Sequence, residues 1–134
     1  MNQDHLSIAE HEVSWLAIRQ PAVLRLLERE LGSARVFRDG DAFRAGLALA
    51  CQLLGVRAQV GAPRLDHHAL AAGLASVRAG RCDRAMVRSI RDQIDELPVV
   101  LTPAEQDAVA TVIAAVIWAV LDSSVRALDD MLVA

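Results

Sequence analysis

Apolar residues recur every three or four positions along most of the chain, which is the spacing of one face of an α-helix. Capping residues, glycines and prolines divide this pattern into segments. We therefore predict an all-α fold of five or six helices, arranged as a bundle in a single domain over residues 1–134. The predicted helices begin near residue 7 and span about 21–31, 42–54, 63 or 66 to 79, 84–97 and 102–132.

Local motifs mark several of these helix ends. Ser7 with Glu10, and Thr102 with Glu105, have the spacing of a capping box, in which the hydroxyl accepts from the amide three residues later and the carboxylate accepts from the amide of the cap. Pro103 suits the first position of the last helix. Further expected ends are the caps Asp41, Asp66 and Asp83 and the terminating glycines Gly32, Gly55 and Gly80.

Two short regions leave alternatives open. Pro21 lacks a backbone donor and disfavours helical geometry at Gln20, so it either kinks one helix or separates two. Residues 56–60 alternate apolar and polar side chains, which suits a short extended segment after Gly55.

The longest apolar run covers residues 108–121. A helix that is apolar on all sides must be surrounded by other helices, from its own chain or from a partner. The run has 14 residues and is interrupted by Thr111, whereas a transmembrane helix needs about 20. We therefore predict a central, buried helix and no membrane span.

Small side chains recur along one side of this helix and leave room for a second helix to approach closely. The two tryptophans are the largest apolar groups of the chain, and such groups carry much of the energy of protein interfaces. We expect the small side and the tryptophans to contribute to an interface. The predicted interface residues are Trp15, Ala108, Thr111, Ala115, Trp118 and Ala119.

Composition also favours association. The chain is 54% apolar, and its mean hydropathy is +0.30. A domain of 134 residues has a limited interior, so part of this apolar surface is expected to meet another subunit. We predict a homodimer to which the final helix contributes heavily. Residues 1–6 are polar and lack the order of a secretory signal, which favours a cytoplasmic protein.

Five arginines stand against two aspartates between positions 78 and 92. Such a stripe contacts phosphates in nucleic-acid-binding proteins. The net charge of −3 and the aromatic content of 3% oppose that interpretation. Because residues 92–134 carry eight acids and one arginine, we expect the stripe to pair mainly with acidic side chains. The stripe comprises Arg78, Arg81, Arg84, Arg88 and Arg91, and the expected partners are Asp95, Glu96, Asp122, Asp129 and Asp130.

No pattern indicates catalytic residues, a metal site or a cofactor. The adjacent His67 and His68 would point about 100° apart on a helix, whereas helical metal ligands need a spacing of three or four to share a face. No serine has the glycine-flanked turn of a nucleophile, and the chain has no lysine. Cys51 and Cys82 lack a metal-type or redox-type spacing, which predicts free thiols.

Three classes of function remain open. The leading prediction is a non-enzymatic interaction module, an adaptor, antagonist or regulator, which forms a homodimer and contacts an unidentified protein. The second is a nucleic-acid-binding regulator that uses the arginine stripe. The third is a small-molecule or metal-binding helical enzyme that uses His11, His67 or an arginine-lined pocket.

Overall fold

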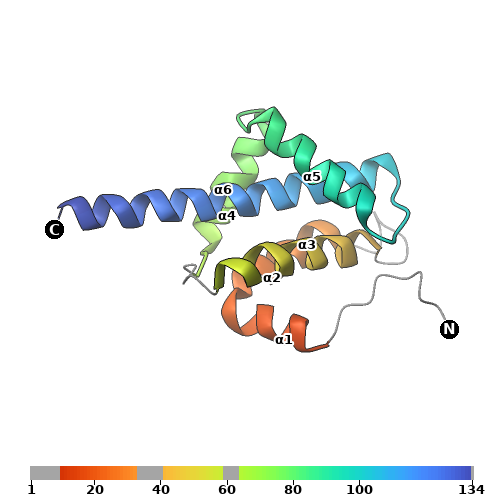
Figure 1. Cartoon of the computed structure of the whole chain (residues 1–134), viewed down its shortest axis with the longest axis horizontal. Helices are drawn as coiled ribbons and strands as arrows, with labels where there is room; N and C mark the ends of the chain where they lie inside the picture. The colour runs from red at the N-terminus through yellow and green to blue at the C-terminus, as the bar shows by residue number, and fades with distance from the viewer. Residues whose placement is uncertain (1–9, 33–40, 59–63, 134) are drawn as a thin grey trace.

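The computed structural model describes residues 10–32, 41–58 and 64–133, which contain six helices and no strand (Figure 1). The predicted all-α class is therefore confirmed for the described part of the chain. The helices are α1 (Glu10–Arg19), α2 (Pro21–Leu31), α3 (Asp41–Ala58), α4 (His67–Arg78), α5 (Arg84–Glu96) and α6 (Pro103–Val133).

The long apolar helix α6 lies at the centre of this arrangement. It contacts α2, α3, α4 and α5, whereas α1 packs on α2 and α3. Most of its side chains between Val109 and Val120 are buried. Buried apolar side chains from all six helices form one continuous core. Helices of the same chain thus enclose the apolar run of α6 over most of its length, as the sequence predicts.

Capping hydrogen bonds stabilise the expected helix starts. The amide of Glu105 donates to Thr102 Oγ1 at 3.2 Å, and the amide of Thr102 donates to Glu105 Oε1 at 2.9 Å. Asp66 caps α4 by accepting from the amide of Ala69 at 2.7 Å. These pairs satisfy backbone donors that no helical carbonyl reaches. The predicted start at Ser7 and the turn at residues 33–40 lie outside the described residues.

The turn between α4 and α5 also follows the prediction. Gly80 has a φ of 75°, a left-handed conformation that glycine adopts without steric cost, and α4 ends just before it. Asp83 then caps α5 by accepting from the amide of Ala85 at 2.9 Å.

Pro21 separates two helices. The first helix ends at Arg19, Gln20 has a non-helical ψ of 63°, and α2 begins at Pro21. The buried side chain of Gln20 secures this break, because its Oε1 accepts a hydrogen bond from the amide of Leu65 at 2.9 Å. The junction of α1 and α2 is therefore tied to the segment that precedes α4.

The expectation that Gly55 ends the third helix is wrong, because α3 continues through this glycine to Ala58. The expectation of an extended segment at residues 56–60 is also wrong for residues 56–58, which belong to α3. Residues 59 and 60 lie outside the described residues. Glycine inside a helix costs only about 1 kcal/mol relative to alanine. Packing of α3 on α2 and α6 is sufficient to offset a cost of that size.

At Gly73, α4 crosses α6 at very short range. A Cβ atom added to Gly73 would lie 2.6 Å from the backbone carbonyl oxygen of Ala115. No side chain fits there, so the glycine allows the two backbones to touch. Ala115 belongs to the small side of α6, and that side thus receives a helix of its own chain.

The G73A variant tests this contact. In an unobstructed helix, a change from glycine to alanine stabilises by roughly 0.5–1 kcal/mol. At Gly73 we expect instead a loss of about 1–3 kcal/mol in the free energy of unfolding, because α4 and α6 must separate. Urea titration followed by circular dichroism measures the change. The control is A72G at the exposed neighbouring position, which reports helix propensity alone; a gain in stability in G73A would contradict the close crossing.

Candidate interaction surfaces

The predicted interface residues fall into two groups. Ala115 and Ala119 are fully buried within the single chain, and α4 covers the backbone at Ala115. The other members are half-buried and retain some exposed surface. These are Trp15, Ala108, Thr111 and Trp118. A second chain would therefore reach this side of α6 only at its two ends, around Ala108 and around Trp118.

The C-terminal part of α6 extends past the other helices (Figure 1). Leu121, one turn after the half-buried Trp118, is 50% exposed. The other large apolar side chains exposed in the described residues are Ile18 on α1 and Val100 between α5 and α6. Unlike these two, Leu121 lies where a long helix leaves the core, so the helix face around it is accessible to another molecule.

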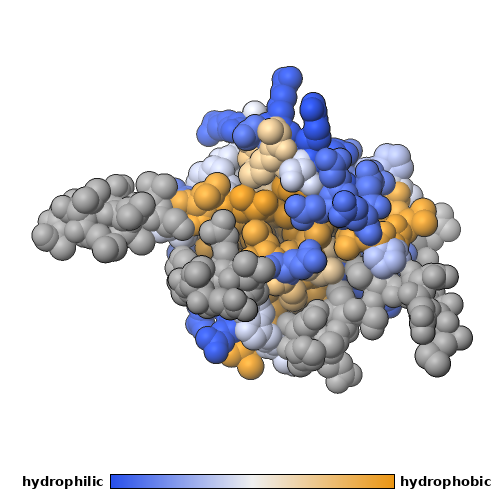
Figure 2. All heavy atoms as spheres, in the orientation of Figure 1, coloured by the Kyte–Doolittle hydropathy of each residue, from blue (hydrophilic) through white to orange (hydrophobic). Residues whose placement is uncertain are grey.

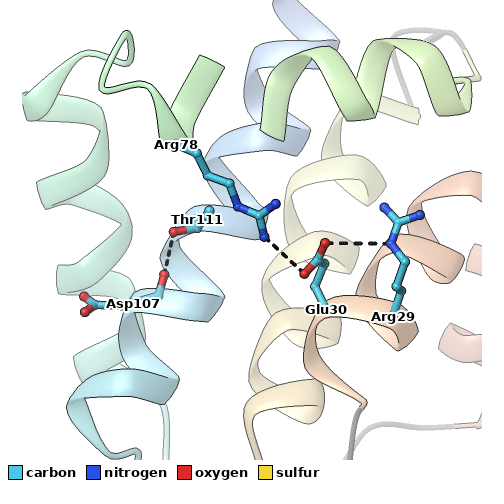
Figure 3. A network of polar contacts seen from close by, with 5 residues as sticks. All are labelled: Arg29, Glu30, Arg78, Asp107 and Thr111. Carbon is cyan, nitrogen blue, oxygen red and sulfur yellow. Dashed lines mark hydrogen bonds and ion pairs between the residues drawn. The ribbon is translucent and has the colours of Figure 1, made fainter. Parts of the chain in front are cut away.

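Polar side chains of α2, α4 and α6 line one pocket, and an ion pair joins α4 to α2 (Figure 3). Arg78, the last residue of α4, donates to a carboxylate oxygen of Glu30 at 3.3 Å, and Arg29 Nε lies 3.7 Å from the other oxygen. Thr111 Oγ1 donates to the backbone carbonyl of Asp107 at 2.7 Å. A pocket of about 260 Å³ has Glu30, Arg78, Asp107 and Thr111 in its lining. Because Arg78 shares it with two carboxylates, the pocket is poorly suited to an anionic ligand.

The arginine stripe contains two residues that form ion pairs and three that form none among the described residues. Arg78 pairs with Glu30, and Arg91 on α5 pairs with Asp107 on α6. The remaining members are exposed and have no ion pair within the described part of the chain. They are Arg81, Arg84 and Arg88.

Glu30 and Asp107 are the two partners that the sequence did not reveal. Glu30 lies 48 residues from Arg78, and no helical spacing connects them. Asp107 belongs to the acidic end of the chain, but only the packing of α5 on α6 brings it to Arg91. The arginine is 60% exposed in the first pair, and the aspartate is 62% exposed in the second. Each pair therefore contributes about 0–1 kcal/mol to stability.

The residues considered for chemistry are scattered. His67 and His68 are exposed at the start of α4, and the side chain of His11 lies outside the described set. Within that set, no three His, Cys, Asp or Glu side chains are placed to hold a metal ion. Neither Cys51 nor Cys82 forms a disulfide, as predicted, and both are half-buried. Burial raises the pKa of the Cys82 thiol, which opposes its use as a nucleophile.

By length and composition, α6 is apolar enough to cross a membrane over Pro103–Ser123, a stretch of 21 residues with hydropathy 1.6. The 14-residue run at 108–121 is therefore too short a stretch on which to exclude a membrane-spanning helix. More than half of the most apolar part, 56%, is buried inside the fold. The core helix of a soluble protein can have the same composition, so length and apolarity do not distinguish a membrane-spanning helix from a buried core helix.

Comparison with known proteins gives no significant match to a family model, to a curated protein or to a solved structure.

The reactivity of Cys82 provides a test of its environment. Because burial raises its pKa, the folded protein holds less thiolate at neutral pH than an exposed cysteine would. In a C51A variant, which leaves Cys82 as the single thiol, iodoacetamide at pH 7 should alkylate the folded protein more slowly than the urea-unfolded protein. Mass spectrometry over time gives both rates. A faster reaction of the folded protein would indicate an activated cysteine and contradict the prediction.

Proposed function

We propose that this protein is a non-enzymatic interaction module that forms a helical homodimer through the C-terminal part of α6. The observation that carries the proposal is the exposed Leu121 on a helix that continues beyond the other five. The buried small side of α6 is not needed for this contact, because α4 already packs against it.

The sequence beyond Leu121 supports pairing between helices. Apolar residues follow the seven-residue repeat of a coiled coil, with alternating steps of three and four, at Trp118, Leu121, Val125, Leu128 and Leu132. A helix that carries such a stripe leaves it in water unless another helix covers it. A second copy offers the same stripe, so each chain can cover the other.

The energies are adequate for a stable pair. Removing a large apolar side chain from water contributes about 1.5–3 kcal/mol. Association costs about 4–15 kcal/mol in lost translational and rotational freedom. Burying five apolar side chains on each of two chains contributes more free energy than the lower part of that cost. In the dimer, the half-buried Trp118 would lie at the start of the contact, where the two helices leave their cores.

A charge placed in the stripe tests the homodimer. We expect the wild-type chain of 14.5 kDa to scatter light as a dimer at micromolar concentration. The L121D variant should scatter as a single chain, because an unpaired carboxylate in an apolar contact is costly. Leu121 is half exposed in the single chain, so the fold should tolerate the change, and circular dichroism verifies its helix content.

The matched control is V100D, which places the same charge at an apolar residue that is 93% exposed and precedes the N-terminus of α6, at the other end of this helix from the proposed contact. This variant should remain a dimer. A wild-type mass of one chain would overturn the proposed pairing, and a dimer that persists in L121D would exclude this part of α6 as its interface.

A second function is favoured by a separate observation. Arg81, Arg84 and Arg88 are exposed and have no ion pair in the described residues, so their charges are available to phosphates. They lie on the short turn and the second helix of the α4–α5 pair, which has the order of a helix-turn-helix. The candidate is a nucleic-acid-binding regulator.

Salt dependence tests this second function. The affinity for a 20-base-pair DNA duplex should fall steeply as salt rises. The double variant R84A/R88A should weaken binding and lower the slope of log affinity against log salt by about two. The control R19A/R25A removes two exposed arginines from α1 and α2 and should bind like the wild type. Absence of binding at low salt would dismiss this candidate.

A further inference from the structure

A groove lies between α3 and α5, with α6 as its floor. Both helices pack on α6, but they make hardly any contact with each other. The space between them has a volume of about 580 Å³. Figure 2 shows hydrophobic residues gathered on this face, where α6 passes between α5 and α3 in Figure 1.

The deep part of the groove belongs to the core. Leu49 of α3, Ile90 of α5 and Ile113 of α6 line it, and each is at most 4% exposed. The half-buried Met86 and Ile117 form part of its walls. The flexible thioether side chain of Met86 can adapt to ligands of different shape. A molecule seated here would touch apolar atoms on three helices.

Uncharged polar side chains stand at the mouth. Gln52 of α3 and Ser89 and Gln93 of α5 line the groove and are exposed. No charged side chain is among the described residues that line it. An apolar interior with a few neutral hydrogen-bonding groups at the rim is the usual composition of a small-molecule site, and the volume falls within the usual range of about 300–1,000 Å³.

The dimensions favour a small molecule over a docked helix. Among the side chains that the structure describes, the lining on α3 extends from Leu49 to Leu53 and on α6 from Ile113 to Ile117, which is about one turn, or 6 Å, on each. A helix that docks in a groove uses anchors at positions i, i+3 or i+4 and i+7, which span about 10 Å. The floor on α6 is too short for such a set of anchors.

We propose that the groove between α3 and α5 binds a small, uncharged, mainly apolar molecule that carries a hydrogen-bonding group. Its apolar part contacts Ile90, Ile113 and Ile117, and its polar end meets the side chains of Gln52 and Gln93 at the mouth. The absence of charged side chains from the lining sets the selectivity, because a charged head group would lose water without gaining an opposite charge. This site shares no residue with the proposed dimer contact and does not depend on it.

Nile red, an uncharged dye that fluoresces in apolar surroundings, is the probe. The full-length protein should bind it saturably, with one dye per chain. Unlabelled 1-decanol should displace the dye at a concentration about tenfold below that of decanoate or decyltrimethylammonium, because the two ions must be desolvated. The double variant Q52L/Q93L should weaken the binding of 1-decanol by roughly threefold to tenfold, the usual effect of a lost hydrogen bond.

A blocking variant locates the dye. In S89W, an indole introduced at the exposed mouth fills the groove without disturbing a buried residue, and Nile red binding should be lost. The control D95W introduces the same side chain at an exposed position on the opposite side of α5 and should retain binding. Circular dichroism verifies that both variants keep their helices.

Each result decides the proposal. Saturable binding that is lost only in S89W supports it. Binding that survives in S89W, including dye bound to the exposed end of α6, overturns it, as does the absence of saturable binding. Preferential displacement by the charged amphiphiles would refute the uncharged ligand. A wild type that binds no dye, together with an S89W variant whose light-scattering mass falls from two chains to one, would indicate that a second copy covers the groove instead.

Discussion

The contact between the backbones of α4 and α6 is the constraint on which the other packing depends. At Gly73 and Ala115 the two helices touch without an intervening side chain. This close crossing lets α4 cover the small side of α6, while α2, α3 and α5 cover other parts of its surface. The central helix can therefore be apolar on nearly all sides and still be shielded from water.

A single long helix at the centre has a geometrical consequence. With 31 residues α6 is about 46 Å long, whereas the next longest helix, α3, has 18 residues and is about 27 Å long. No neighbour can follow α6 from end to end, so its C-terminal turns project beyond them (Figure 1). Because α3 and α5 hardly meet on the surface of α6, a groove also remains beside it. Both candidate binding surfaces result from incomplete coverage of one helix.

Polar interactions fix the positions of the helices but contribute little to the free energy of folding. In the described residues, every buried side-chain nitrogen or oxygen has a hydrogen-bond partner. The buried Gln20 secures the break before Pro21 by accepting from the Leu65 amide, and Glu105 completes the cap of α6. The ion pairs Arg78–Glu30 and Arg91–Asp107 are largely exposed and contribute little energy. Burial of apolar surface against α6 therefore supplies most of the stability.

The sequence by itself determined the features that depend on nearby residues: the helical periodicity, the caps at Asp66, Asp83 and Thr102, and the burial of the apolar run in α6. These follow from hydrogen bonds and side-chain spacing within a few turns of one helix. Only the tertiary structure decided that Pro21 separates two helices, that α3 continues past Gly55, and that a groove lies beside α6. Each of these features depends on which distant helices pack together, and the spacing of residues along the chain does not specify those contacts.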